Sequence, residues 1–80
     1  MNEIVNFKRR IREIVAEKTG LELENISDEQ FLDADLNLSD DEIKEIIEII
    51  EEELILDLTE EKKFIETVGD LTITVEEEID

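Results

Sequence analysis

The feature that most constrains the fold of this chain is a stripe of apolar side chains between residues 43 and 54. Five aliphatic residues lie at positions i, i+3, i+4, i+7 and i+11: Ile43, Ile46, Ile47, Ile50 and Leu54. This spacing places them on one face of an α-helix. Most of the remaining side chains in the stretch are acidic. We therefore predict a helix that buries its isoleucines in a core and exposes carboxylates.

The start of this helix is marked by polar residues. Ser39 is followed three residues later by Glu42, the spacing of a capping box in which each side chain bonds the backbone of the other residue. Asp40 and Asp41 fall in the first turn, where the helix dipole favours negative charge. The helix is thus predicted to begin just after Ser39.

A second helix is predicted at the start of the chain. From Glu3 to about Lys18, apolar residues recur at helical spacing: Ile4, Phe7, Ile11, Ile14 and Val15. Gly20 follows where a left-handed residue often ends a helix.

The last element carries conflicting signals. Leu71, Ile73 and Val75 alternate with threonines as in a strand, whereas Val68, Leu71, Val75 and Ile79 fit a helix. Thr67 as N-cap, with Asp70 reaching back, favours a helix.

The two connections are less regular. Residues 21 to 38 predict an ordered loop, in which Leu21, Leu23 and Ile26 can reach the core and a second capping-box pair, Ser27 and Gln30, opens a turn that ends near Phe31. Residues 54 to 58 are apolar enough for a strand but lack a partner strand. Thr59 then predicts the N-cap of a short helix to about Ile65, with Phe64 and Ile65 buried.

These elements predict one all-α domain over residues 1–80. We expect a small four-helix bundle of three main helices and one short helix, with a long loop between the first two.

The charge of the chain restricts its partners. It has 26 acidic and 8 basic side chains, for a net charge of −18, which disfavours nucleic acids and anionic membranes and favours partners with basic patches. The bases gather near the start, as Lys8, Arg9, Arg10, Arg12 and Lys18. We interpret this cluster as pairing with the acidic body in preference to a binding patch. No apolar run is long enough for a membrane span or signal peptide, so we expect a cytoplasmic protein. We also expect it to be a monomer.

The composition also limits chemistry. Without cysteine or histidine the chain has no Cys or His nucleophile and no common zinc site. Acidic and polar residues from Asp33 to Asp41 follow part of a calcium-loop template, but Leu38 stands where that loop needs glycine and Lys44 where it needs glutamate. Neither a dedicated metal site nor an enzymatic activity is predicted.

Five segments along the chain form a recognisable series: the first helix ending near Gly20, Ile26-Ser27-Asp28, Phe31 with Asp35-Leu36, Glu51-Glu52-Glu53-Leu54, and Thr67-Val68-Gly69-Asp70-Leu71. Together, in this order, they resemble the acyl carrier protein family. The last two are similar to the family's Leu-Glu-Glu-Glu-Phe and Thr-Val-Gly-Asp patterns. The resemblance covers nearly the whole chain and implies a fold in which a serine at the start of the second helix carries 4'-phosphopantetheine.

The chain departs from the family at that serine. Where the family has Asp-Ser-Leu after a loop resembling Asp-Leu-Gly-Ala, this chain has Ser39-Asp40-Asp41 after Asp35-Leu36-Asn37-Leu38. Asp40 therefore occupies the position of the modified serine, and an aspartate cannot form the phosphodiester. Two interpretations of Ser39 stay open: a helix N-cap that is never modified, or an attachment site shifted by one residue. The other serine, Ser27, lies far from this helix start.

The resemblance implies a carrier that presents acyl groups to enzymes of fatty acid or polyketide synthesis, after modification by a phosphopantetheinyl transferase. Its docking acids would be Asp35, Asp40, Asp41, Glu42, Glu45 and Glu48. Its acyl chain would enter among apolar residues that are more simply interpreted as the core: Ile43, Ile46, Ile47, Ile50, Phe64 and Ile65. The alternative is an acidic carrier-like interaction module that is not modified, because of Asp40.

Overall fold

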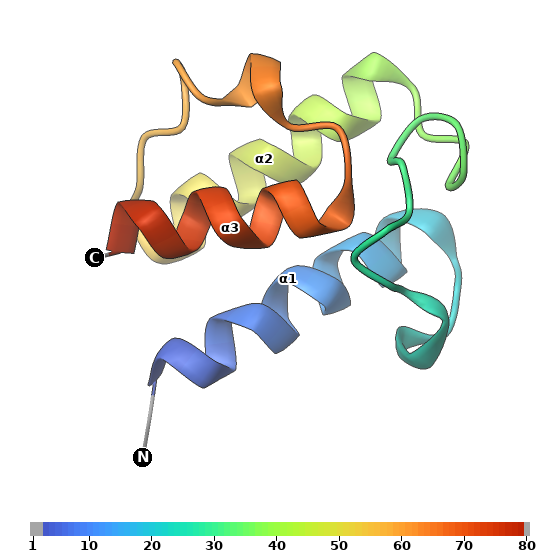
Figure 1. The fold of residues 1–80 in the computed structure, drawn as a ribbon, viewed down its shortest axis with the longest axis horizontal. Helices are drawn as coiled ribbons and strands as arrows, with labels where there is room; N and C mark the ends of the chain where they lie inside the picture. Colours follow the sequence, from blue (N-terminus) through green and yellow to red (C-terminus); the bar gives the residue numbers. More distant parts are fainter. Residues whose placement is uncertain (1–2, 80) are drawn as a thin grey trace.

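The computed structural model describes residues 3–79, with side chains from Phe7 onward, and within this range the chain is helical (Figure 1). It contains three α-helices, α1 (Glu3–Thr19), α2 (Asp40–Leu54) and α3 (Val68–Ile79), and two 3-10 turns, η1 (Leu23–Asn25) and η2 (Lys62–Phe64). α1 packs against both α2 and α3. The all-α prediction is confirmed, and residues 3–79 form no strand. The single turn η2 stands where a short fourth helix was expected.

The ends of the helices follow from local chemistry. Gly20 ends α1 in the left-handed region, at φ +79°, and its amide donates to Ala16 O at 2.8 Å. At the start of α3, Thr67 Oγ1 accepts from the Asp70 amide at 3.0 Å, and the Asp70 carboxylate accepts from the Thr67 amide at 3.1 Å. Both predicted signals are therefore confirmed.

The conflict over the last element is settled in favour of a helix. Val68, Leu71 and Val75 are buried in the core, whereas Ile73 is 55% exposed. A strand would have placed Leu71, Ile73 and Val75 on one face, because its side chains alternate. The helical spacing identified the buried residues, although Ile79 at its far end is 39% exposed.

One hydrophobic core joins the helices and the long loop. The three helices contribute Phe7, Ile11, Ile14 and Val15 of α1, Ile46, Ile47 and Ile50 of α2, and Val68, Leu71 and Val75 of α3. The connections contribute Ile26, Leu32, Leu36, Leu38, Leu58 and Ile65. The predicted core contribution of Ile4 lies outside the described side chains. The loop is ordered by this burial, as expected.

Three predictions for the connections were wrong. Leu21 is exposed, and so is Phe64, at 71%. Phe64 instead lies beneath the ammonium of Lys63, whose Nζ is 5.3 Å from the ring centre. Thr59 is not an N-cap: its amide and hydroxyl both donate to Asp57 Oδ1, so that Asp57 organises this turn.

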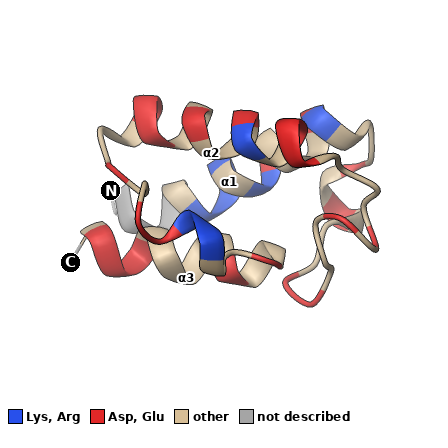
Figure 2. Cartoon of the chain, turned by 90° about the horizontal axis from the view of Figure 1, so that it is seen from above, with Lys and Arg blue, Asp and Glu red and all other residues tan. Residues whose placement is uncertain are grey.

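The basic residues of α1 tie the acidic body together, as the sequence indicated. Lys8 pairs with Glu76 of α3, Arg10 with Glu53 of α2, and Arg12 with Asp28 of the loop. Arg9 pairs with Glu13 within α1, and Lys18 with Glu45 of α2. Figure 2 shows basic segments on α1 and mostly acidic segments along α2. Among residues 3–79, no helix is both long enough and apolar enough to cross a bilayer.

Candidate docking surface

Ser39 forms a complete capping box at the start of α2. Its Oγ accepts a hydrogen bond from the Glu42 amide at 3.1 Å, and Glu42 Oε1 accepts one from the Ser39 amide at 2.9 Å. The backbone of Ser39 is extended, at φ −77° and ψ 166°, as an N-cap requires. The predicted cap is confirmed. The side chain nevertheless remains at the surface.

The loop before Ser39 is held by its own polar groups. Asn37 adopts a left-handed conformation at φ 57°, and its amide donates to Asp33 O at 3.0 Å. The Asp35 carboxylate accepts from the Phe31 amide at 2.8 Å. Asparagine tolerates positive φ better than other non-glycine residues, so Asn37 does here what glycine does in most such turns.

The six predicted docking acids divide into two groups. Asp35 and Glu42 bond the backbone of this chain, as described above, and Glu45 pairs with Lys18. In the part of the chain that the structure describes, the exposed carboxylates of Asp40, Asp41 and Glu48 form no ion pair or hydrogen bond. α2 therefore presents negative charge that no nearby side chain among the described residues neutralises, and its basic residue is Lys44.

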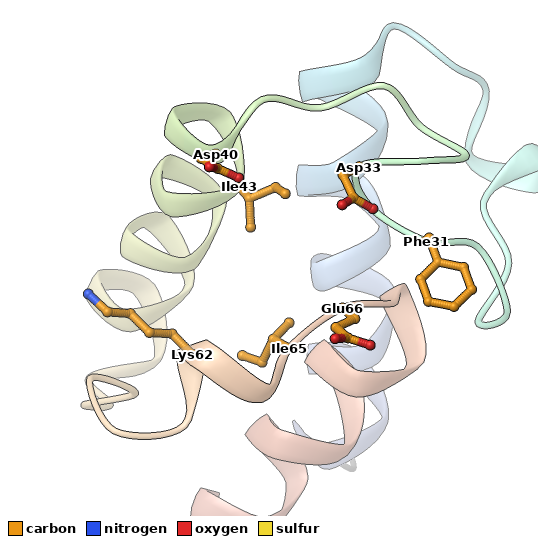
Figure 3. A pocket seen from close by; sticks show the side chains of 7 residues that line it. All are labelled: Phe31, Asp33, Asp40, Ile43, Lys62, Ile65 and Glu66. Carbon is orange, nitrogen blue, oxygen red and sulfur yellow. The ribbon is translucent and has the colours of Figure 1, made fainter.

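A groove of about 380 Å³ lies between the start of α2, the long loop and η2. Its lining residues are Phe31, Asp33, Asp40, Ile43, Lys62, Ile65 and Glu66 (Figure 3). In Figure 3, Ile43 and Ile65 point toward one another, and Asp40, Asp33 and Glu66 carry carboxylates around them. Ser39 is not part of this lining.

Four lining residues were not predicted as site residues: Phe31, Asp33, Lys62 and Glu66. They come together because residues 30–32 pair with residues 66–68, through Leu32 N to Glu66 O at 2.9 Å and Val68 N to Gln30 O at 3.1 Å. No local pattern in either segment indicates this pairing. It could have been inferred only from a homologous structure or from covarying positions.

The expected acyl-chain lining is only partly assembled. Ile43 and Ile65 border the groove, but Ile46, Ile47 and Ile50 are packed inside the core. Phe64 is exposed and is not a groove residue. The interpretation as core residues is thus confirmed for Ile46, Ile47 and Ile50, and also for Ile65, which is buried where it borders the groove.

The calcium-loop residues do not assemble around an ion. The Asp33 carboxylate accepts from the adjacent Ala34 amide at 2.6 Å, and that of Asp35 from Phe31. Within the described residues, no three acidic side chains are grouped so that they could bind a metal ion.

The chain matches no protein-family model, and a search of curated proteins gives no significant match. We therefore infer the function of this protein from its own residues and geometry.

Proposed function

We propose that this protein is an acidic, acyl-carrier-like interaction module that docks through α2 and the preceding loop to partners with Lys and Arg patches. The observation that carries this proposal is the exchange of roles at the start of α2. Ser39 is the N-cap, and Asp40, at the position of the family's modified serine, borders the groove with a carboxylate.

Charge supports docking. Asp40, Asp41 and Glu48 are exposed and lack intramolecular partners in the described residues, so an approaching basic surface would not have to break existing pairs. The net charge of −18 would also accelerate association with a cationic partner, and this effect would weaken as salt rises.

Two measurements test the proposal. First, intact mass is recorded after incubation with coenzyme A and a broad-specificity phosphopantetheinyl transferase, with Ser39→Ala in parallel. We expect no mass gain under conditions that fully modify an ordinary carrier protein. A phosphopantetheine-sized gain abolished by Ser39→Ala would overturn the unmodified module.

Second, a Lys/Arg-rich peptide is titrated into ¹⁵N-labelled protein. Shifts of the α2 amides that disappear with added salt are expected. The absence of binding at low salt would contradict docking.

A second candidate is a working carrier with 4'-phosphopantetheine on Ser39, delivering acyl groups to synthase enzymes of lipid or polyketide metabolism. It is favoured by the surface position of Ser39 and by Asn37, which is left-handed at the family's glycine position. The Ser39 hydroxyl fits the attachment because it is accessible, and the positive end of α2 suits a phosphate. The arm would supply the thiol that this cysteine-free chain lacks.

A further inference from the structure

We infer that the groove at the start of α2 receives the side chain of an arginine from the partner protein. This inference rests on the proposed docking function and adds to it the identity of one contact. Its basis is the combination of an apolar floor, an acidic rim and an aromatic ring in one small groove.

The size of the groove limits its occupant. A volume of about 380 Å³ is near the lower end of the range found for ligand sites in proteins, roughly 300–1,000 Å³. Its floor is formed by Ile43 and by Ile65, which is 7% exposed. This space, lined by two isoleucines and three carboxylates, suits one long side chain that ends in a positive charge.

The charges at the rim select a cation. Asp33, Asp40 and Glu66 contribute three carboxylates against the one ammonium of Lys62. In Figure 3 the Lys62 side chain extends away from the centre of the groove. The pKa of Asp57, in the loop after α2, is lowered mainly by hydrogen bonds from Thr59 and only in small part by the charge of Lys62. The carboxylates therefore determine the charge at the centre of the groove, which is negative.

Arginine fits this combination better than lysine. Its three methylenes can lie along Ile43 and Ile65 while the charged head stays at the rim. The planar guanidinium can bond two carboxylates at once. Phe31 lines the same groove and has 43% of its surface exposed, so a guanidinium at the rim could reach its ring. Lysine would keep the positive charge, but its ammonium lacks the planar arrangement of donors with which a guanidinium bonds two carboxylates at once.

The test uses short peptides with flanking lysines that differ at one central residue: arginine, lysine or citrulline. Citrulline has nearly the shape of arginine without its charge. Titration into ¹⁵N-labelled protein is expected to shift the amides of Phe31, Ile43, Ile65 and Glu66, with affinity falling from arginine to lysine to citrulline. Equal affinities for the arginine and citrulline peptides would overturn the inference. This comparison requires no substitution in the protein, so a loss of folding cannot confuse it.

Two protein variants locate the contact. Asp40→Asn and Asp41→Asn remove the same charge from the same helical turn, but only Asp40 lines the groove. Both should lose some general attraction. For the arginine peptide, Asp40→Asn should bind roughly fivefold more weakly than Asp41→Asn, the upper range for an exposed ion pair, and this ratio should vanish with citrulline.

The outcomes separate this inference from the docking function. Equal losses in the two variants, with shifts spread along the outer face of α2, would overturn the groove contact and leave docking in place. Absence of binding by every peptide at low salt would overturn both.

Discussion

Arg10 on α1 holds the carboxylate of Glu53 on α2 through two nearly parallel hydrogen bonds. Arg10 Nε lies 2.8 Å from Glu53 Oε1, and Nη2 lies 2.8 Å from Oε2. This is the paired geometry that gives guanidinium–carboxylate contacts their directionality. It joins the first half of α1 to the last turn of α2, where an acidic helix end would otherwise be unfavourable for the dipole.

This pair predicts a specific pH dependence. The hydrogen bond from Arg10 lowers the pKa of Glu53. The pair therefore stabilises the fold above the ordinary glutamate pKa of about 4.5, and its contribution is lost as the pH falls through the lower folded-state value. Urea unfolding of Glu53→Gln should show a lower midpoint than the unmodified chain at neutral pH, with the difference shrinking on acidification. The effect is small because both groups are exposed.

Glu52→Gln is the matched control for that prediction. Glu52 is the exposed neighbour on the same turn, and no ion pair involves it within residues 3–79. Its neutralisation relieves repulsion, so at neutral pH it should leave the midpoint unchanged or raise it. A fall equal to that of Glu53→Gln would contradict the proposed role of the Arg10 pair.

The capping box predicts a stability loss that is independent of any modification. Ser39→Ala removes the acceptor of the Glu42 amide and should lower the free energy of unfolding by about 1 kcal/mol. Ser39→Asn keeps a capping oxygen and should therefore retain most of the stability that the cap provides. Ser27→Ala serves as the control, because the hydrogen bonds of that turn do not use the serine hydroxyl. The Ser27 amide donates to Gln30 Oε1, and the Gln30 amide donates to the Ser27 carbonyl oxygen. Chemical denaturation of the three variants checks the order.

Ile55 predicts a gain in stability. This residue ends α2 in the left-handed region, at φ 55° and ψ 57°, although its β-branched side chain disfavours that conformation. The side chain is 89% exposed and offers little burial in return. Ile55→Gly should therefore raise the free energy of unfolding by about 1 kcal/mol.

Gly20→Ala is the opposite case. Gly20 has φ +79°, and an added Cβ would meet no atom within 4 Å. The substitution should lower the free energy of unfolding by about 1 kcal/mol through backbone strain alone. Thermal unfolding of both variants would reveal the opposite signs; a loss in Ile55→Gly would mean that the isoleucine makes a stabilising contact.

Local signals predicted the fold better than they predicted the groove. Helical spacing and the caps at Ser39 and Thr67 act within one turn, so they can be recognised in the sequence, and they fixed α2 and α3 correctly. Phe64 was predicted to be buried because it is apolar, but it is 71% exposed, and no signal within its own turn indicates which side of η2 faces the core. The groove residues Phe31 and Glu66 are 35 positions apart in the chain and meet only through backbone pairing between two irregular segments.

Exchanging the two residues at the start of α2 tests whether the rest of the surface is that of a carrier. The double variant Ser39→Asp, Asp40→Ser keeps the composition and the net charge, and aspartate caps helices as well as serine does. It places a hydroxyl at the groove rim, where the family carries its serine. We expect this variant to gain the mass of phosphopantetheine when it is incubated with the transferase and coenzyme A. The chain with its original sequence should gain no mass; if it does, the result would support carriage on Ser39 instead. Failure of the folded double variant to react would show that Asp41 or the surrounding surface also prevents recognition. It would count against the acyl-carrier-like character that we propose for this surface.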